Sequence, residues 1–350
     1  MTIHIRIAQS SDAKQWDQYV LHHPDGIGYQ LFAWKNAVRT AYGFKAVYLM
    51  AIRSNRVAGV LPLIHIRPPF LPGRLVSLPY CDAGGPLADS ESVEKELMNK
   101  AIEIARKRKI GKLSIRSIQP FAGIDTTGSV KPDKVRMLLK LSERSDRLLA
   151  SFKSKLRSQI KKPIRDGLTV KIGSVELLDD FYPLFAENMH TLGSPVHSAN
   201  WIRSILHHFN NRAHLVLVRM PDKKPAAGGV LLCHPNQVSV PWASSLRSLN
   251  RWNPNMLLYW SFLKYACDMG YPMFDFGRST PGEGTHRFKK QWNTKSAPLF
   301  WNAFSTDLQK RRNAFSFRNA AFLKLDEYWK KLPVSLTKQM GPTFRKYIDL

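Results

Sequence analysis

The N-terminal half of the chain alternates between helix-like and strand-like hydrophobic patterns. Apolar residues recur at helical spacing in 13–21, 32–41 and 92–109, whereas 3–8, 112–118 and 135–141 are short apolar runs typical of strands. Between them, Ala46–Ile66 contains two apolar runs joined by Arg53-Ser54-Asn55-Arg56. A polar joint of this length between two such runs predicts a β-hairpin.

The second half repeats this order at larger size. Helical patterns cover 148–160, 176–192, 199–209 and 256–269, and a second hairpin is predicted over the turn Pro-Asp-Lys-Lys-Pro. The phrase VAGVLPL at Val57–Leu63 matches AAGGVLL at Ala226–Leu232, and each is the return strand of a predicted hairpin. Two copies of one α/β unit follow, each with a mixed, largely antiparallel sheet flanked by helices.

The C-terminal segment has a different pattern. Leu308, Phe315, Phe322 and Trp329 recur every seven residues, and basic residues surround them. This predicts an amphipathic helical tail, which either docks on the second domain or lies on an anionic membrane surface. The expected domains are therefore 1–145, 146–305 and the tail 306–350.

Charge narrows the choice of partner. The chain has 53 Lys plus Arg against 26 Asp plus Glu, a formal net charge of +27. Such a protein is expected to bind something anionic: RNA, acidic lipid, or a substrate that carries phosphate. Composition does not choose among the three.

Targeting signals and metal-ligand patterns do not stand out. No apolar run reaches the roughly 18 residues of a membrane span, and the N-terminus lacks the apolar core of a secretory signal, so we expect a cytoplasmic protein with no transmembrane segment. Cys81, Cys233 and Cys267 are widely spaced, which favours reduced core thiols. We expect no bound metal, since His22-His23 and His207-His208 are neighbours that diverge on a helix.

One stretch, FDFGRSTPGEGTHRFKKQW at Phe274–Trp292, carries the clearest candidate chemistry. Its Asp-Phe-Gly is not that of a kinase, because the other kinase motifs are missing. Gly282 and Gly284 would let backbone amides approach an anion, and Arg278 and Arg287 surround them with positive charge. The alternative is a turn between a core strand and a solvated basic helix.

These residues, together with AGVLPL and SLPYCDAGGPLAD, resemble the FemAB-like branch of the GNAT acyltransferase superfamily, and in particular the members that accompany exosortase (PEP-CTERM) and exopolysaccharide systems. The resemblance implies two tandem GNAT-like domains. It also implies transfer of an acyl group from acyl-CoA, or of an amino acid from aminoacyl-tRNA, to an amine. About twenty residues separate Leu192 from Ala213, too few for the helical arm that the resemblance associates with the tRNA-dependent enzymes.

The resemblance implies roles for particular residues. Lys289 would stabilise the oxyanion, and Trp34, Lys35 and Arg39 would face the phosphates of the acceptor. The residues implied at the donor are Arg278, Ser279, Gly282, Gly284, Arg287, Phe288 and Trp292. Asp275 is the expected base with Glu283 as second choice, although a carboxylate at Asp275 could instead orient Arg278 or cap the next turn.

The leading hypothesis is an N-acyltransferase that modifies an amino group on a cell-envelope, peptidoglycan or exopolysaccharide precursor at the inner face of the membrane. The acceptor would be a phosphate-bearing small molecule or a lipid-linked saccharide or peptide, with tRNA a further candidate partner. Two alternatives remain. One is a non-catalytic scaffold of the exopolysaccharide machinery, suggested by Asn293 where Fem relatives have glycine, and the other is an RNA-binding module.

Overall fold

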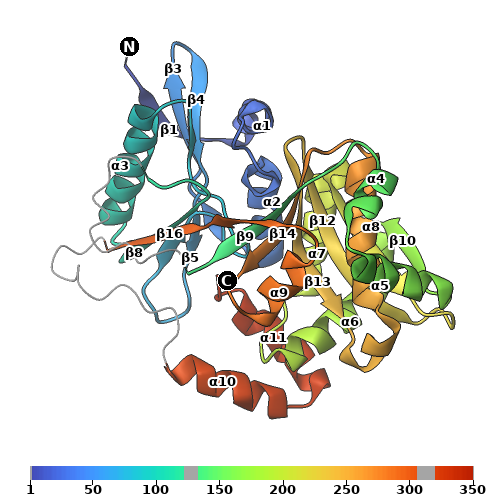
Figure 1. Cartoon of the computed structure of the whole chain (residues 1–350). Helices are drawn as coiled ribbons and strands as arrows, with labels where there is room; N and C mark the ends of the chain where they lie inside the picture. The colour runs from blue at the N-terminus through green and yellow to red at the C-terminus, as the bar shows by residue number, and fades with distance from the viewer. Residues whose placement is uncertain (1, 122–132, 306–319, 350) are drawn as a thin grey trace. The chain divides into compact units, whose positions relative to one another are not determined.

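The computed structural model describes residues 2–121, 133–305 and 320–349. The chain divides into two compact units (Figure 1). The first comprises Met1–Val135, Ala297–Phe317 and Tyr347–Leu350, and the second comprises Arg136–Ser296 and Arg318–Lys346. These ranges differ from the expected 1–145, 146–305 and 306–350, because two strands pair with strands that are distant from them in the sequence.

The first unit contains a sheet of four strands in the order β1-β3-β4-β7. Its strands are β1 (His4–Ile7), β3 (Leu49–Arg53), β4 (Arg56–Leu61) and β7 (Leu87–Ala88). The β3–β4 hairpin confirms the prediction, since Ser54 and Asn55 form its two-residue turn and both have positive φ. Helix α3 (Glu91–Lys107) packs its buried face, which includes Val93 and Leu97, on this sheet.

A second sheet of the first unit has the order β16-β8-β6-β5-β2. Its strands are β2 (Lys45–Ala46), β5 (Ile64–Ile66), β6 (Arg74–Val76), β8 (Lys112–Ser117) and β16 (Phe300–Ser305). The predicted return strand Val57–Ile66 is thus divided between two sheets. The division falls at Pro62, which lacks the amide hydrogen that a continuous ladder needs. Helices α1 (Ala13–His22) and α2 (Phe32–Tyr42) complete this unit.

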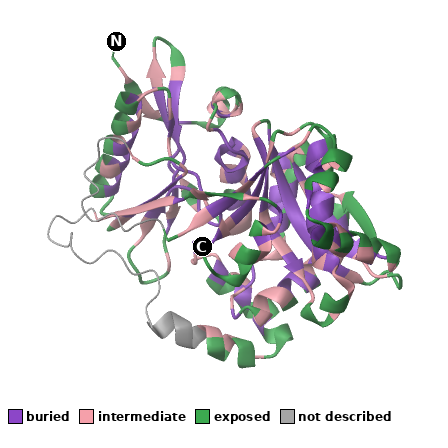
Figure 2. Cartoon of the chain, in the orientation of Figure 1, coloured by how far each residue is buried: buried purple, intermediate pink, exposed green. Residues whose placement is uncertain are grey.

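The second unit is built on a sheet of seven strands in the order β10-β11-β12-β13-β14-β9-β15. Its strands are β9 (Val135–Lys140), β10 (Thr169–Gly173), β11 (Ala213–Arg219), β12 (Pro225–His234), β13 (Gln237–Ser245), β14 (Met273–Ser279) and β15 (Lys295–Pro298). The inner strands of this sheet are largely buried (Figure 2), whereas the edge strands β10 and β15 are mainly exposed. The predicted α/β class is confirmed.

Helices cover both faces of this sheet. A Cβ built at Gly228 would meet Phe181 of α6, and one at the adjacent Gly229 would meet Phe262 of α8. Because neighbouring residues of a strand point to opposite faces, α6 and α8 lie on opposite sides of β12. The helices of the sheet are α4 (Ser145–Ser151), α5 (Ser154–Arg165), α6 (Leu178–Thr191), α7 (Ala199–Phe209), α8 (Pro254–Asp268) and α9 (Gly284–Lys290).

The single helix predicted at 148–160 is wrong. The chain is extended at Phe152 and Lys153, which separates α4 from α5. The Phe152 side chain is buried in this break and contacts the rings of Trp260 and Trp292. Burial of this aromatic ring offsets the free energy lost by interrupting the helix. This is a tertiary contact, which the local hydrophobic pattern does not reveal.

The tail consists of two helices, α10 (Ala320–Lys331) and α11 (Val334–Arg345), separated at Pro333. Leu308 and Phe315 lie outside the described residues. Helices α10 and α11 both contact α6, and α11 buries Thr337, Gly341 and Arg345. The Arg345 guanidinium donates to His197 at 3.1 Å. Docking on the second unit, one of the two expectations for the tail, therefore describes α11 well.

Candidate functional site

The first feature of the candidate site is the place where two parallel strands stop pairing, which we call the opening. Strands β13 and β14 pair only at Val238–Phe274 and Ser239–Asp275, although they continue to Ser245 and Ser279. The ladder between them therefore ends well before their carboxyl ends. In open α/β sheets, ligands bind outside the carboxyl ends of the strands.

The turn that leads from β13 into α8 carries positive charge, and it follows the opening directly in the sequence. Between β13 and α8 lies a 3-10 turn, Arg247–Trp252, in which Arg247 and Arg251 are exposed. The Arg251 guanidinium lies 5.5 Å from the Trp252 ring and the Lys162 ammonium 5.8 Å from it. Cations beside the N-terminal end of a helix attract anions such as phosphate. Sequence reasoning missed these arginines, and Pro254 at the first position of the helix was the available signal.

The Phe274–Trp292 stretch packs against the first turns of α8. The Tyr259 ring lies 5.0 Å from Phe288 and 5.5 Å from Phe276, measured between ring centroids. Trp292 is fully buried in this cluster. Trp292 is thus a core residue, whereas Phe288 is half-buried and nearer to solvent. The predicted donor residues and the start of α8 consequently form one continuous structure.

The glycine loop before α9 has room for a ligand. Apart from the adjoining residues and the backbone of α9 itself, no described heavy atom lies within 4 Å of a Cβ built at Gly282 or Gly284, and Gly282 has a φ of +84° that only glycine adopts readily. The loop is held by its own helix, because Arg287 donates to the Gly282 carbonyl at 3.0 Å. Arg278 is partly exposed, while Ser279 is buried.

Lys289 faces the protein interior. Its side chain is 8% exposed, and its ammonium donates to the Arg278 carbonyl at 2.7 Å. This bond fastens α9 to the end of β14. The oxyanion role that the resemblance implies for Lys289 stays a prediction, and the geometry adds a positioning role.

We expect Lys289→Met to destabilise the protein by about 1–3 kcal/mol, because the Arg278 carbonyl would lose a charged donor in a buried place. The measurement is chemical denaturation of the full chain. Lys290→Met is the matched control, since Lys290 is exposed. Equal unfolding free energies for the two variants would contradict the positioning role of Lys289.

Asp275 is also engaged by the protein. Its carboxylate accepts a hydrogen bond from the Gly277 amide at 2.8 Å and lies 3.8 Å from the Arg136 guanidinium. Arg136 in turn donates to the Gln237 side chain at 3.2 Å. Asp275 therefore caps the turn at Gly277 and pairs with Arg136. Its role as the base stays a prediction.

The residues expected at the acceptor lie in the first unit, on α2. Trp34 is buried and donates to the Pro79 carbonyl at 3.2 Å, so it is part of the core. The Lys35 ammonium lies 4.2 Å from the centroid of the Phe32 ring. Burial, and then the charge of Arg39, lowers the pKa of Lys35. Lys35 and the exposed Arg39 are the two members of this group that reach the surface.

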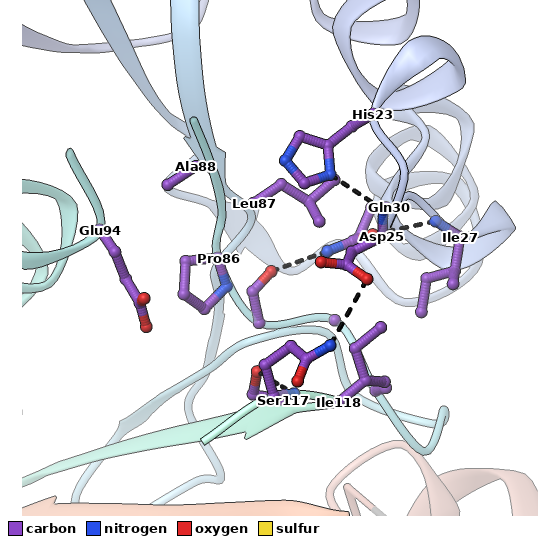
Figure 3. Close-up of a pocket in the computed structure, with 14 residues that line it drawn as sticks. His23, Asp25, Ile27, Gln30, Pro86, Leu87, Ala88, Glu94, Ser117 and Ile118 are labelled. Carbon is purple, nitrogen blue, oxygen red and sulfur yellow. Dashed lines mark hydrogen bonds between the residues drawn. The ribbon is translucent and has the colours of Figure 1, made fainter. Parts of the chain in front are cut away.

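The first unit also has a pocket of about 80 Å³ (Figure 3). Its polar lining is His23, Asp25, Gln30, Glu94, Ser117 and Gln119. Gln30 donates to the Gly85 carbonyl at 2.9 Å and accepts from the Ile27 amide at 3.1 Å, which fixes one wall. No lysine or arginine of the described residues lines this pocket, an unusual composition in so basic a chain.

Glu94 makes this pocket sensitive to pH. Burial, and then the nearby Glu91 carboxylate, raises the pKa of Glu94 to about 6. A raised carboxyl pKa favours folding below the unfolded value and opposes it once pH rises through the folded value. We expect Glu94→Gln to raise the melting temperature at pH 7.5 and to leave it unchanged near pH 4. A gain of equal size at both pH values would contradict this origin.

Neither a metal centre nor a membrane span is found in the part of the chain that the structure describes. No group of three or more His, Cys, Asp or Glu side chains there is placed to hold a metal ion. No helix within 2–121, 133–305 and 320–349 is long and apolar enough to cross a bilayer. Cys81, Cys233 and Cys267 are buried, and none of them forms a disulfide among the described residues.

Part of the chain matches a known family, and its fold is similar to that of solved structures. Residues 150–290 match the family model of the acetyltransferase (GNAT) domain. The crystal structure of FemX superposes with a TM-score of 0.67 at 18% identity, covering 88% of this chain and 98% of that one. No curated protein matches the chain significantly.

Two further solved structures share the fold. The C-terminal domain (DUF2156) of a putative lysylphosphatidylglycerol synthetase from Agrobacterium fabrum has a TM-score of 0.57 at 15% identity, covering 92% of this chain and 96% of its own. A tandem GNAT protein from the clavulanic acid biosynthesis pathway has a TM-score of 0.52 at 13% identity, with coverages of 87% and 99%. The predicted tandem GNAT-like, FemAB-like fold is confirmed.

Proposed function

We propose that the protein is an acyltransferase whose donor is acyl-CoA bound in the second unit, because residues 150–290 match the acetyltransferase (GNAT) family model and the chain has a FemAB-like fold. The observation that carries the proposal is the short β13–β14 ladder, which lies inside the matched residues. In this proposal the opening receives the acyl chain of the donor. The turn with Arg247 and Arg251 and the start of α8 receive its phosphates.

The reaction needs few groups from the protein. The acceptor nitrogen attacks the thioester carbonyl, a C–N bond forms, and the C–S bond breaks. CoA leaves as the thiolate and takes up a proton, while the excess proton of the amine passes to a base or to water. Backbone amides of the Gly282–Gly284 loop are the proposed donors to the oxyanion, and Lys289 holds that loop against β14.

A CoA thioester suits this chain better than an aminoacyl-tRNA. Between α6 and the next strand the chain has one α-helix, α7, and a short 3-10 turn, and α7 buries Trp201, Ile205 and Phe209 against its own unit. No antiparallel pair of long helices projects from the described residues of this region. The structure thus lacks the arm that the resemblance associates with tRNA-dependent transfer.

The acceptor in this proposal is an amine on a phosphate-bearing cell-envelope or exopolysaccharide precursor. The FemAB-like resemblance and the net charge of +27 support a phosphorylated acceptor. In the first unit, Lys35 and Arg39 are candidates to contact its phosphates. Action at the inner face of the membrane follows if this precursor is lipid-linked.

Turnover tests the proposal. The full chain is incubated with a panel of acyl-CoAs and with amine acceptors that include nucleotide-linked amino sugars, and products are identified by mass spectrometry. Release of CoA together with an acylated amine is expected. CoA release without an acylated product would indicate hydrolysis, and the absence of both across the panel would favour the non-catalytic scaffold.

A further inference from the structure

A loop of the first unit exposes large apolar side chains on a base of positive charge. Residues 67–73, RPPFLPG, connect the antiparallel strands β5 and β6. At the tip, Phe70 is 106% exposed and Leu71 is 63% exposed. Among the described large hydrophobic residues, Phe70 has the highest exposed fraction.

The tip is stiff. Pro68, Pro69 and Pro72 fix their own φ angles, and the Leu71 amide donates to the Pro68 carbonyl at 3.4 Å. The paired strands β5 and β6 hold both ends of the loop. The exposed phenyl ring is therefore presented with little loss of conformational entropy on binding, which favours insertion into an apolar phase.

Cations surround the base of the loop. Lys45 lies opposite His65 in the β2–β5 ladder, and Arg67 begins the loop. The pKa of His65 is lowered by burial first, and then by the charges of Arg108, Arg67 and Lys45, which places these cations together around it. Lys45, Arg67 and the run Arg106–Lys109 at the end of α3 are exposed.

We infer that this loop docks the chain on an anionic lipid bilayer, with Phe70 and Leu71 inserted at the headgroup boundary and the surrounding cations on the lipid phosphates. A stiff apolar tip with cations at its base fits a surface that is negatively charged outside and apolar within. RNA would use the cations and leave the apolar tip in water. A protein groove would cover the tip and give no reason for the cations.

The inference moves the expected membrane contact from the tail to the first unit. Helix α11 does expose Leu336, Met340 and Phe344, but its opposite face is docked. The apolar side chains of the loop are the more exposed of the two sets. Its lipid binding goes beyond the proposed acyl transfer and requires no turnover, so either idea can fail without the other.

Sedimentation with lipid vesicles tests the inference on the full chain. Vesicles of phosphatidylcholine alone are compared with vesicles that contain about 30% phosphatidylglycerol. Wild type is expected to pellet with the anionic vesicles. The double substitution Phe70→Ser with Leu71→Ser is expected to weaken binding on the order of 10-fold or more, because the apolar contribution is removed.

Met269→Ser is the matched control, because Met269 is 60% exposed on the second unit. It should bind like wild type, and all three proteins should melt alike. Unchanged binding of the double variant overturns the inference, as does a wild type that pellets with neither vesicle. As a second readout, Phe70→Cys labelled with an environment-sensitive dye should show a blue shift with anionic vesicles, and an unshifted spectrum would contradict insertion.

Discussion

Replacing Gly284 by valine is expected to abolish the binding of acyl-CoA while leaving the stability of the fold unchanged. Apart from the adjoining residues and the backbone of α9, no described heavy atom lies within 4 Å of the Cβ position of Gly284, and its φ is not in the left-handed region, so valine fits the free protein. In the proposed complex that same space belongs to the donor. A loss of at least about 10-fold in affinity, or 1.4 kcal/mol, is expected.

The measurement is calorimetric titration with acetyl-CoA beside a melting curve. Gly111→Val is the matched control, because Gly111 is equally open, also lies outside the left-handed region, and belongs to the first unit. Gly282 is less suitable, since its φ of +84° would add backbone strain. Normal affinity of the Gly284→Val protein would remove this loop from the donor site.

Trp292→Ala should cost about 3–5 kcal/mol of unfolding free energy, the range for an aromatic side chain deleted from a core. Trp292 is fully buried and its ring contacts those of Phe152, Tyr259, Phe276 and Phe288. These contacts join α9, β14 and α8, so the loss would loosen the proposed donor site as well. Chemical denaturation measures the change.

Trp292→Phe separates packing from ligand contact. It keeps an aromatic ring and removes a buried indole N–H that has no hydrogen-bond partner among the described residues, so its cost should be under about 1.5 kcal/mol. A Trp292→Ala protein that is as stable as wild type but fails to bind acyl-CoA would restore the direct donor contact inferred from the sequence.

Features that depend on residues close together in the sequence could be predicted. The hairpin at Ser54–Asn55 follows from the polar turn between two apolar runs, and helix 199–209 has the predicted bounds. Strand pairing was less accessible. Strands β9 and β16 are ordinary apolar runs, and nothing local indicates that β9 lies between β14 and β15 or that β16 pairs with β8.

The candidate site was likewise predictable only where it depends on residues close together in the sequence. The Phe274–Trp292 motif was recognised from its residues, and its aromatic members do pack together. The partners of Lys289 and Asp275 are a carbonyl and an amide of the main chain, and a sequence does not reveal such partners. Arg247 and Arg251 were missed because their interest comes from the β13–β14 opening, which is a tertiary feature.

Hydrogen exchange of the wild-type chain, with and without acetyl-CoA, tests the central claim most directly, since it locates the donor without needing the acceptor. Binding in the second unit predicts slower exchange in two segments, from the end of β13 into α8 and from the end of β14 into α9. The first unit should be unchanged. Protection confined to the pocket with His23 and Glu94, or no protection at saturating acetyl-CoA, would contradict a donor site in the second unit.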